Sequence, residues 1–148
     1  MKIRKFKKED AKRVAYIIHK AIFEVNSKHY SKRICKNLWK GNTPAKLIEK
    51  SKIRDMFVIE KDKVILGTAS LSSNLVRTVF VNPRYHGKGV GRKLMNHIEI
   101  VAKKKGLKKL QFHSSLNAEG FYKKLGYKKI RKEYHKEFGR SILMQKKL

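Results

Sequence analysis

Apolar residues recur at helical spacing in the first third of the chain. An apolar stripe from Val14 to Val25 has the period of one helix face. Acidic residues stand just before it, where the helix dipole favours negative charge. Further on, Thr43-Pro44 is typical of a helix start, a capping residue followed by proline in the first turn. The pattern predicts three helices, at Glu9–Val25, Ser31–Lys40 and Ala45–Lys50.

The remaining sequence alternates between strand and helix patterns. Short alternating or apolar runs predict strands at Lys2–Phe6, Met56–Glu60, Val64–Leu71, Leu75–Val81, Lys108–His113, Tyr127–Tyr134 and Ser141–Lys147. Two further helices are expected at Gly89–Lys105 and Asn117–Leu125. Because helical crossovers join early antiparallel strands to later ones, the sheet should be mixed. We therefore expect one α/β (α+β) domain over residues 1–148, with about six or seven central strands flanked by about four or five helices.

Composition excludes several classes of protein. Cys35 is the only cysteine, so neither an intrachain disulfide nor a cysteine-based metal site is expected, and no histidine spacing suggests a metal ligand set. No apolar run approaches the roughly 20 residues of a membrane span. The N-terminus lacks the apolar segment of a signal peptide. We expect a cytoplasmic protein with no metal and no membrane partner.

The charge balance is strongly basic. The chain has 39 Lys and Arg against 11 Asp and Glu, a formal net charge of +28, and such a field attracts polyanions. However, the lysines lie along nearly the whole chain, without the aromatic-interleaved stripe of single-strand-binding proteins. A compositional bias of the surface is therefore favoured over a nucleic-acid partner, which stays open as an alternative.

A glycine-rich segment joins one predicted strand to the next predicted helix. Residues 86–91 read H-G-K-G-V-G, and glycines at alternate positions let backbone N–H groups converge without interference from Cβ atoms. The following helix adds the positive end of its dipole, and Lys88, Arg92 and Lys93 add full charges. This segment predicts a site for a phosphate-bearing ligand.

The spacing of the glycines restricts the ligand. The Walker A pattern is absent, and the order G-x-G-x-G differs from the G-x-G-x-x-G of dinucleotide-binding folds. Such folds also place an acidic residue near the end of the next strand. The strand here, Leu110–His113, has none. A nucleoside triphosphate and a nicotinamide cofactor are therefore both disfavoured.

Two longer motifs resemble those of a known family. The first motif is Val81-x-Pro83-x-Tyr85-x-Gly87-x-Gly89-x-Gly91-x-x-Leu94, and the second is Asn117-Ala118-x-x-Phe121-Tyr122-x-x-Leu125-Gly126-Tyr127. Their order and spacing resemble the GNAT acetyltransferase superfamily, although His86 stands where the family has Gln or Arg. The resemblance implies a GNAT fold and an N-acetyltransferase that uses acetyl-CoA. The acetyl group would pass to a primary amine by direct attack on the thioester.

The resemblance also implies roles for single residues. The cofactor site would consist of Val79, Phe80, Val81, His86, Gly87, Lys88, Gly89, Val90, Gly91, Arg92, Asn117, Phe121 and Tyr122. Within it, Tyr122 would act as the general acid at the leaving sulfur. The backbone N–H of Val81 would donate to the thioester oxygen.

The acceptor half of the reaction is less defined by sequence. Many relatives carry a glutamate in the segment that corresponds to 74–78, which has no carboxylate here. His113 is a candidate base, since imidazole changes protonation near neutral pH, and Glu24, Glu60 and a water chain are alternatives. Tyr30 and Trp39 are candidate walls of the acceptor pocket.

Several functional alternatives stay open at this point. The acceptor could be a small molecule or a peptide or protein amine, and the chain could act as a monomer or a homodimer. The alternatives to an enzyme are a basic protein bound to nucleic acid or ribosomes, or a CoA-sensing module on the same fold.

Overall fold

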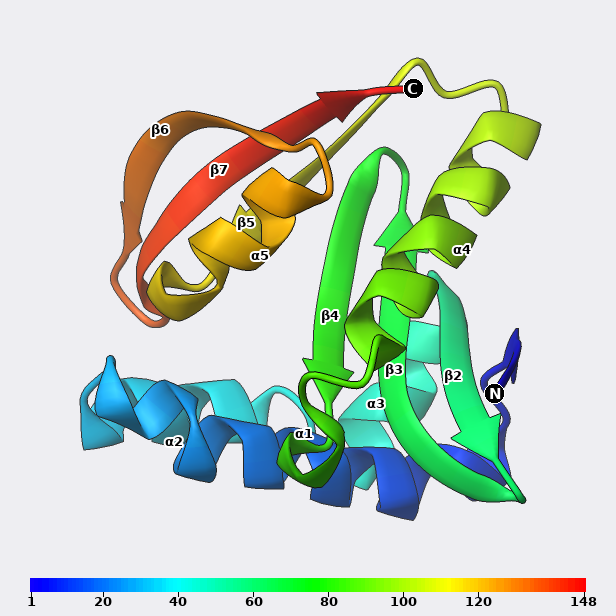
Figure 1. The fold of residues 1–148 in the computed structure, drawn as a ribbon. Coiled ribbons are helices and arrows are strands. Elements are labelled where there is room, and N and C mark those ends of the chain that lie inside the picture. The colour runs from blue at the N-terminus through cyan, green and yellow to red at the C-terminus, as the bar shows by residue number, and fades with distance from the viewer.

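The sheet has seven strands in the order β1-β2-β3-β4-β5-β7-β6. The computed structural model describes residues 1–148 (Figure 1). The strands are β1 Lys2–Lys5, β2 Asp55–Lys61, β3 Val64–Ser72, β4 Leu75–Val81, β5 Lys109–Ser114, β6 Lys128–His135 and β7 Gly139–Lys147. Neighbours pair antiparallel except β4 and β5, which are parallel. The predicted mixed sheet is confirmed.

Five α-helices cover the sheet. They are α1 Ala11–Glu24, α2 Lys32–Lys40, α3 Pro44–Ser51, α4 Val90–Lys104 and α5 Glu119–Lys124. Ser31 and Thr43 cap α2 and α3 through their side-chain oxygens, in accordance with the sequence pattern. The helix expected at Asn117–Leu125 is shorter, because residues 116–118 form a 3₁₀ turn before α5. None of the helices is long and apolar enough to cross a bilayer.

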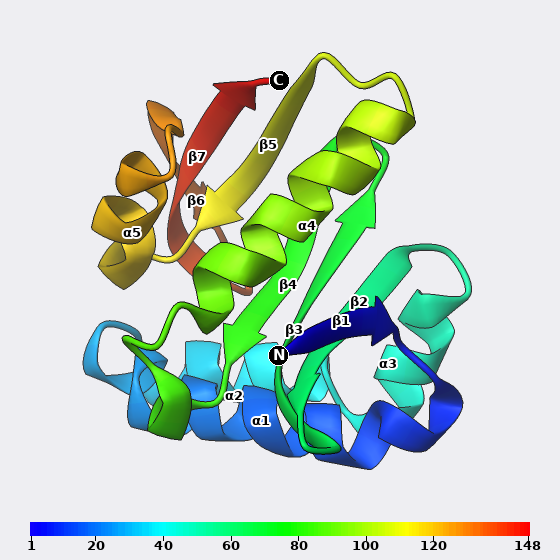
Figure 2. The ribbon, with the colours of Figure 1, turned by 45° about the vertical axis from the view of Figure 1, so that its right-hand side comes forward.

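Two hydrophobic cores lie on the two faces of the sheet. The larger core joins α4 and α5 to the strands through residues such as Leu94, Ile98 and Phe112. The smaller core joins α1 and α3 to β2 and β3 through residues such as Ile18, Leu47 and Val58. Helices α1 and α2 run below the strand ends, while α4 lies in front of β3 and β4 (Figures 1 and 2).

The sheet divides at its only parallel pair. Strands β4 and β5 are matched at a single position, Leu75 with Gln111, and a further backbone bond joins the Gln111 N–H to the Asn74 carbonyl at 2.9 Å. Beyond that position the strands diverge, so that β5, β6 and β7 form a separate arm with α5 (Figure 2). The divergence leaves a gap between β4 and β5, and the site is built around this gap.

Candidate functional site

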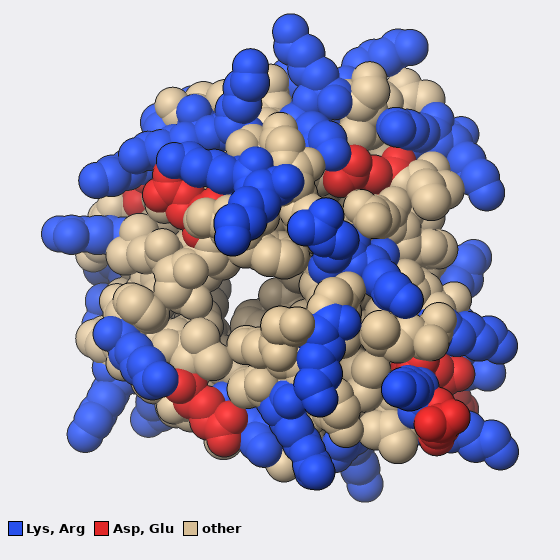
Figure 3. Space-filling view, in the orientation of Figure 1, with Lys and Arg blue, Asp and Glu red and all other residues tan.

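The gap between β4 and β5 passes through the molecule. Figure 3 shows an opening between the arm that carries α5 and the part that carries β4, with uncharged residues on its visible walls and lysines or arginines around it. An extended, largely uncharged ligand segment can therefore lie between the two strands. The unpaired backbone groups of β4 and β5 along the gap are the natural hydrogen-bond partners of such a ligand.

A β-bulge shapes the side of the gap that β4 provides. Ser70 of β3 matches Arg77 and Thr68 matches Phe80, so two residues of β4 stand opposite one of β3. Thr78 occupies the bulge with a φ of 53°. This left-handed conformation is strained for a β-branched residue, and such strain is typical of functional sites.

The last residue of β4 presents its backbone to the gap. The Asn82 N–H donates to the Leu66 carbonyl of β3 at 2.8 Å. Because the N–H groups of successive residues point to opposite sides of a strand, the N–H and carbonyl of Val81 point away from β3. The Val81 N–H is therefore on the side of the gap, where the family resemblance implies a donor for the thioester oxygen.

The glycine loop offers a row of free backbone donors. Gly87 and Gly89 have φ values of 76° and 79°, which favour glycine, and Gly89 caps α4. The N–H groups of residues 87–92 have no acceptor within the chain, whereas the His86 N–H donates to the Pro83 carbonyl at 3.2 Å. Six consecutive donors at a helix N-terminus can hold a phosphate or pyrophosphate. Of the predicted backbone contacts, the one at His86 is thus already occupied.

The His86 side chain attaches the loop to β4. Its Nε2 lies 3.1 Å from the Val81 carbonyl oxygen, which can only accept, so the ring donates from Nε2. The atypical residue of the motif therefore has a positioning contact that the sequence did not indicate.

The two sequence motifs meet at Gly91 and Phe121. A Cβ built on Gly91 would lie 3.0 Å from the Phe121 ring, so this aromatic side chain packs closely against the first turn of α4 at the glycine. Phe121 is 40% exposed, and its ring packs edge-on against Tyr122. Phe121 thus brings the arm that carries α5 against the start of α4.

Tyr122 is buried on the face of β5 that α5 covers. Its ring centroid lies 4.0 Å from that of Phe112, and burial raises the pKa of its hydroxyl above the ordinary value. The hydroxyl has no hydrogen-bond partner in the chain. The only fully buried side-chain oxygen without such a partner is Oε1 of Glu133, so the Tyr122 hydroxyl keeps some contact with solvent. A protonated, unpartnered hydroxyl is suited to donate to a ligand.

His113 projects from the opposite face of β5. Side chains alternate along a strand, and Phe112 points towards Tyr122, so His113 points away from α5. Its Nδ1 lies 2.9 Å from Glu133 Oε1, although the ring N–H is not aligned with that oxygen, so the contact is an ion-pair contact when the ring is protonated. A carboxylate beside Nδ1 leaves Nε2 free for proton transfer.

Three cationic side chains lie on the face of the sheet from which His113 projects, and the sequence did not indicate that they would lie together. Lys50, Arg54 and Arg77 form what we call the basic cluster. Leu75 and Gln111 are in register, so Arg77 and His113, each two residues further on, share one face of the sheet. Arg54 reaches this face with Nη1, which lies 3.4 Å from the Thr78 hydroxyl. Only Arg77 belongs to a predicted strand, and no motif connects it with the other two.

Lys50 is the most buried member of the cluster. Its ammonium donates to the Gly41 carbonyl at 2.6 Å and to Asn42 Oδ1 at 3.2 Å. Burial, with added repulsion from Arg54 and Arg77, lowers the pKa of Lys50 to about 8. Burial and Arg77 also lower the pKa of Arg54.

The other predicted site residues lie in different surroundings. Asn117 is exposed and its side chain forms no hydrogen bond within the chain. Tyr30 connects three segments, because its hydroxyl donates to the Arg140 carbonyl at 2.6 Å and accepts from the Leu116 N–H at 3.0 Å. Trp39 packs edge-on against His19 of α1, with ring centroids 4.7 Å apart. The contacts of Tyr30 and Trp39 are thus with other parts of the fold.

The two remaining carboxylate candidates are both paired. Glu60 binds Arg4 at 3.2 Å where β1 joins β2, two strands away from the gap. Glu24 lies 3.9 Å from Lys20 on the same helix. Neither contact brings a carboxylate to the gap.

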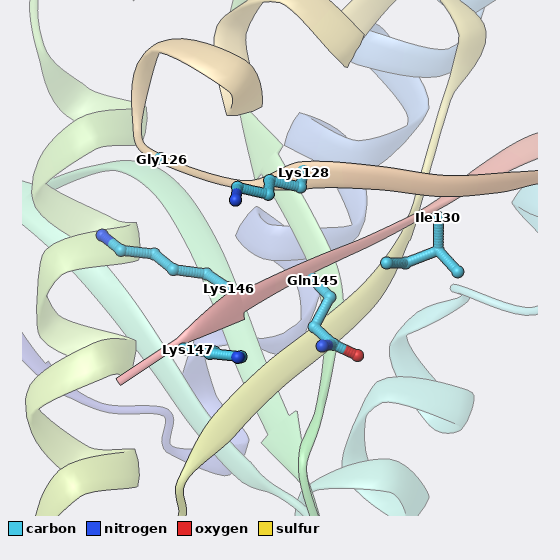
Figure 4. A pocket seen from close by; sticks show the side chains of 6 residues that line it. All are labelled: Gly126, Lys128, Ile130, Gln145, Lys146 and Lys147. Carbon is cyan, nitrogen blue, oxygen red and sulfur yellow. The ribbon is translucent and has the colours of Figure 1, made fainter.

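A separate cavity of about 290 Å³ lies against the β6–β7 hairpin (Figure 4). It is lined by Gly126, Lys128, Ile130, Gln145, Lys146 and Lys147. The Lys146 ammonium is bound to Glu99 and to the Leu125 carbonyl, both at 2.8 Å. This cavity contains none of the predicted site residues.

Comparison with known families and proteins gives consistent matches. The family model described as "Acetyltransferase (GNAT) domain" matches residues 25–148. An uncharacterized N-acetyltransferase, CT2212 of Chlorobaculum tepidum, is 34% identical over 87 residues, which cover 55% of each chain. The uncharacterized protein YyaT of Bacillus subtilis is 31% identical over 77 residues, covering 52% of this chain and 51% of YyaT. The chain thus spans about half the length of the curated relatives that it matches.

Solved structures share the fold along the whole chain. A GCN5-related N-acetyltransferase from Rhodopseudomonas palustris superposes with a TM-score of 0.92 at 24% identity, covering 99% of this chain and 95% of that one. The PaiA N-acetyltransferase of Thermoplasma acidophilum, in complex with coenzyme A, has a TM-score of 0.83 at 20% identity, covering 99% and 98%. At these identities the likeness shows the fold, and the expected GNAT fold is confirmed.

Proposed function

The chain belongs to the GNAT acetyltransferase family, and on that premise we propose that it transfers the acetyl group of acetyl-CoA to an amine. The observation that carries the proposal is the row of free N–H groups at residues 87–92, at the end of the strand that borders the gap. Pyrophosphate is the ligand that such a row suits best. The coenzyme A bound to PaiA, a protein of the same fold, agrees with this assignment.

The two faces of the gap suit the two halves of an acyl transfer. Val81 would donate its N–H to the thioester oxygen, and Tyr122 would protonate the leaving sulfur from the face of α5. The acceptor amine would approach from the opposite face, where His113 could take its proton with Glu133 beside Nδ1. Attack of the amine nitrogen on the thioester carbon forms the amide bond and breaks the carbon–sulfur bond, and CoA leaves as the thiol.

The proposal is tested by release of free CoA from acetyl-CoA with a panel of amines, together with calorimetric binding of acetyl-CoA. Gly89→Ala is the informative variant for the binding step, because a Cβ would enter the space where the pyrophosphate is placed. Gly106→Ala is its matched control, since both glycines have a φ of 79° and neither Cβ would meet an atom within 4 Å.

Both substitutions should destabilise the fold by about 1–2 kcal/mol through the same backbone strain. Only Gly89→Ala should weaken acetyl-CoA binding, by about tenfold or more. Equal affinities in the two variants would remove the loop from the cofactor site. Absence of CoA release with every amine, despite acetyl-CoA binding, would favour a CoA-sensing module instead.

A further inference from the structure

The basic cluster has three positive charges and no negative partner. No ion pair in the structure includes Lys50, Arg54 or Arg77. The Arg54 side chain forms one hydrogen bond, to the neutral Thr78 hydroxyl, and uses only Nη1 for it. Most of the donors on this guanidinium are therefore left for another partner.

The local fold forces these cations together. The Arg54 N–H donates to the Lys50 carbonyl at 3.0 Å, which fixes the turn that follows α3. The side chain of Arg54 then reaches the residue next to Arg77 in β4. Lys50 and Arg54 are each only partly exposed, unlike most cations of this surface. Besides burial, the charges of Arg54 and Arg77 lower the pKa of Lys50, and the charge of Arg77 lowers the pKa of Arg54, so an anion bound between these cations would be favoured.

The position of the cluster connects it with the reacting groups. Arg77 is two residues beyond the Leu75–Gln111 pair, where the gap opens, and shares its face with His113. Arg54 binds the bulge residue of β4 on the way to Val81. The donors assigned to the cofactor's pyrophosphate follow the other end of β4, so the cluster is separate from that site.

We propose that the acceptor amine carries an oxyanion, a carboxylate or a phosphate, which the basic cluster binds on the face of the sheet opposite α5. The inference rests on the proposed acetyl transfer, because it assigns the acceptor of that reaction. The oxyanion would hold the amine near His113 and leave the amine nitrogen directed into the gap. Arginine suits this role because its planar fork can bind either oxyanion through two parallel hydrogen bonds.

The test uses pairs of amines that differ only in the anionic group. β-Alanine against β-alaninamide, and the natural α-amino acids against their amides, form the carboxylate arm. Phosphoethanolamine against ethanolamine forms the phosphate arm. Each compound is assayed with acetyl-CoA for CoA release by the unmodified chain and by Arg54→Gln, Arg77→Gln and Arg13→Gln. Arg13 is exposed on α1 and stacks over Tyr16, so its variant removes one positive charge away from the gap.

The anionic member of at least one arm should have a kcat/KM at least about tenfold higher than its neutral partner, which corresponds to about 1.4 kcal/mol, because charge-assisted hydrogen bonds are the stronger ones. Arg54→Gln and Arg77→Gln should remove that preference, and Arg13→Gln should keep it. Arg77→Gln leaves the contact between Arg54 and Thr78 intact, so acetyl-CoA affinity should stay unchanged in that variant. The arm that shows the preference identifies the oxyanion as carboxylate or phosphate.

A second readout separates this inference from the proposed function. The same amines are added to protein saturated with CoA, and the melting temperature is measured. A rise with the anionic members alone, lost in Arg54→Gln, supports the cluster as an anion site even without turnover. Turnover that is equal for neutral and anionic amines overturns the inference and leaves the acetyl transfer intact. Absence of both the preference and the thermal shift overturns the inference as well.

Discussion

The replacements Tyr122→Phe and Tyr127→Phe remove the same atom from two neighbouring tyrosines and should have opposite consequences. The rings lie 6.1 Å apart and both side chains are buried. The Tyr127 hydroxyl donates to Glu99 Oε2 at 3.2 Å, whereas the Tyr122 hydroxyl has no partner in the chain. The pair therefore separates the hydroxyl that we propose as the acid, on Tyr122, from one that is bound within the fold, on Tyr127.

The expected stabilities follow from these contacts. A hydrogen bond to a charged group is worth about 1.5–3 kcal/mol. In Tyr127→Phe the Glu99 carboxylate would still accept a hydrogen bond from Lys146 at 2.8 Å, so the free energy of unfolding should fall by only about 1–2 kcal/mol. That loss corresponds to about 2–4 °C of melting temperature per kcal/mol in a chain of this size. Tyr122→Phe removes a buried hydroxyl that has no partner, so the free energy of unfolding should stay within about 1 kcal/mol of the parent value or rise.

The expected activities run the other way. Tyr122→Phe should lower kcat by roughly 10²–10⁴, about 3–5 kcal/mol of barrier, if its proton reaches the leaving sulfur. Tyr127→Phe should keep kcat within a few-fold, since its hydroxyl is bound to Glu99.

The assays are CoA release with the best amine of the panel and thermal unfolding of both variants. An unchanged kcat in Tyr122→Phe would refute the role of the hydroxyl as the acid. A large fall in kcat accompanied by an equally large loss of stability would show that Tyr122 acts through the fold.

Three further predictions concern the supports of the site. Tyr30→Phe should reduce the free energy of unfolding by about 1–3 kcal/mol and speed amide exchange in the β6–β7 hairpin, because its hydroxyl joins β7 to the segment before α5; unaltered exchange would contradict this. Gly67→Ala should cost about 1–3 kcal/mol in urea unfolding and weaken acetyl-CoA binding, because the new Cβ would lie 2.8 Å from the Phe80 carbonyl and displace β4; a variant with parental stability and affinity would refute it. Burial and the neighbouring arginines lower the pKa of Lys50 to about 8, so above that pH the unfolded chain binds more protons at Lys50 than the folded chain does. The free energy of unfolding should therefore rise from pH 7 to 10 more steeply in the parent than in Lys50→Met. Parallel pH profiles of the two proteins in denaturant unfolding would exclude the shift.

Local signals in the sequence predicted most elements of the fold. Ser31 and Thr43 were expected to begin helices and do so, because capping depends on a few adjacent residues. The loop around Gly87 and Gly89 was also predicted from local signals, because glycine by itself permits the positive φ values that the loop adopts at these residues. Strand β4 was expected at Leu75–Val81 and has those bounds.

Contacts between distant segments were not visible in the sequence. The pairing of His113 with Glu133 joins β5 to β6 across β7, and no spacing in the chain indicates it. Tyr30 illustrates the same limit, because an aromatic residue in an irregular segment suggests a pocket wall as readily as a support. Its two backbone partners are 86 and 110 residues further along the chain.

The division of the sheet is a feature that the local pattern of residues does not predict, and it determines the site. Two strands of ordinary composition would normally pair along their whole length, yet β4 and β5 share only the Leu75–Gln111 match. Thr78 is in the left-handed conformation at the bulge, a cost of about 1–3 kcal/mol that the surrounding structure must over-determine. Its hydroxyl is held by Arg54, and the turn after α3 fixes Arg54 in turn. The same contact that stabilises the strained bulge thus places the basic cluster beside the gap. The proposed cofactor channel and the proposed acceptor site therefore depend on one another. Removal of the Arg54 side chain should reduce the preference for an anionic acceptor more than it reduces acetyl-CoA affinity.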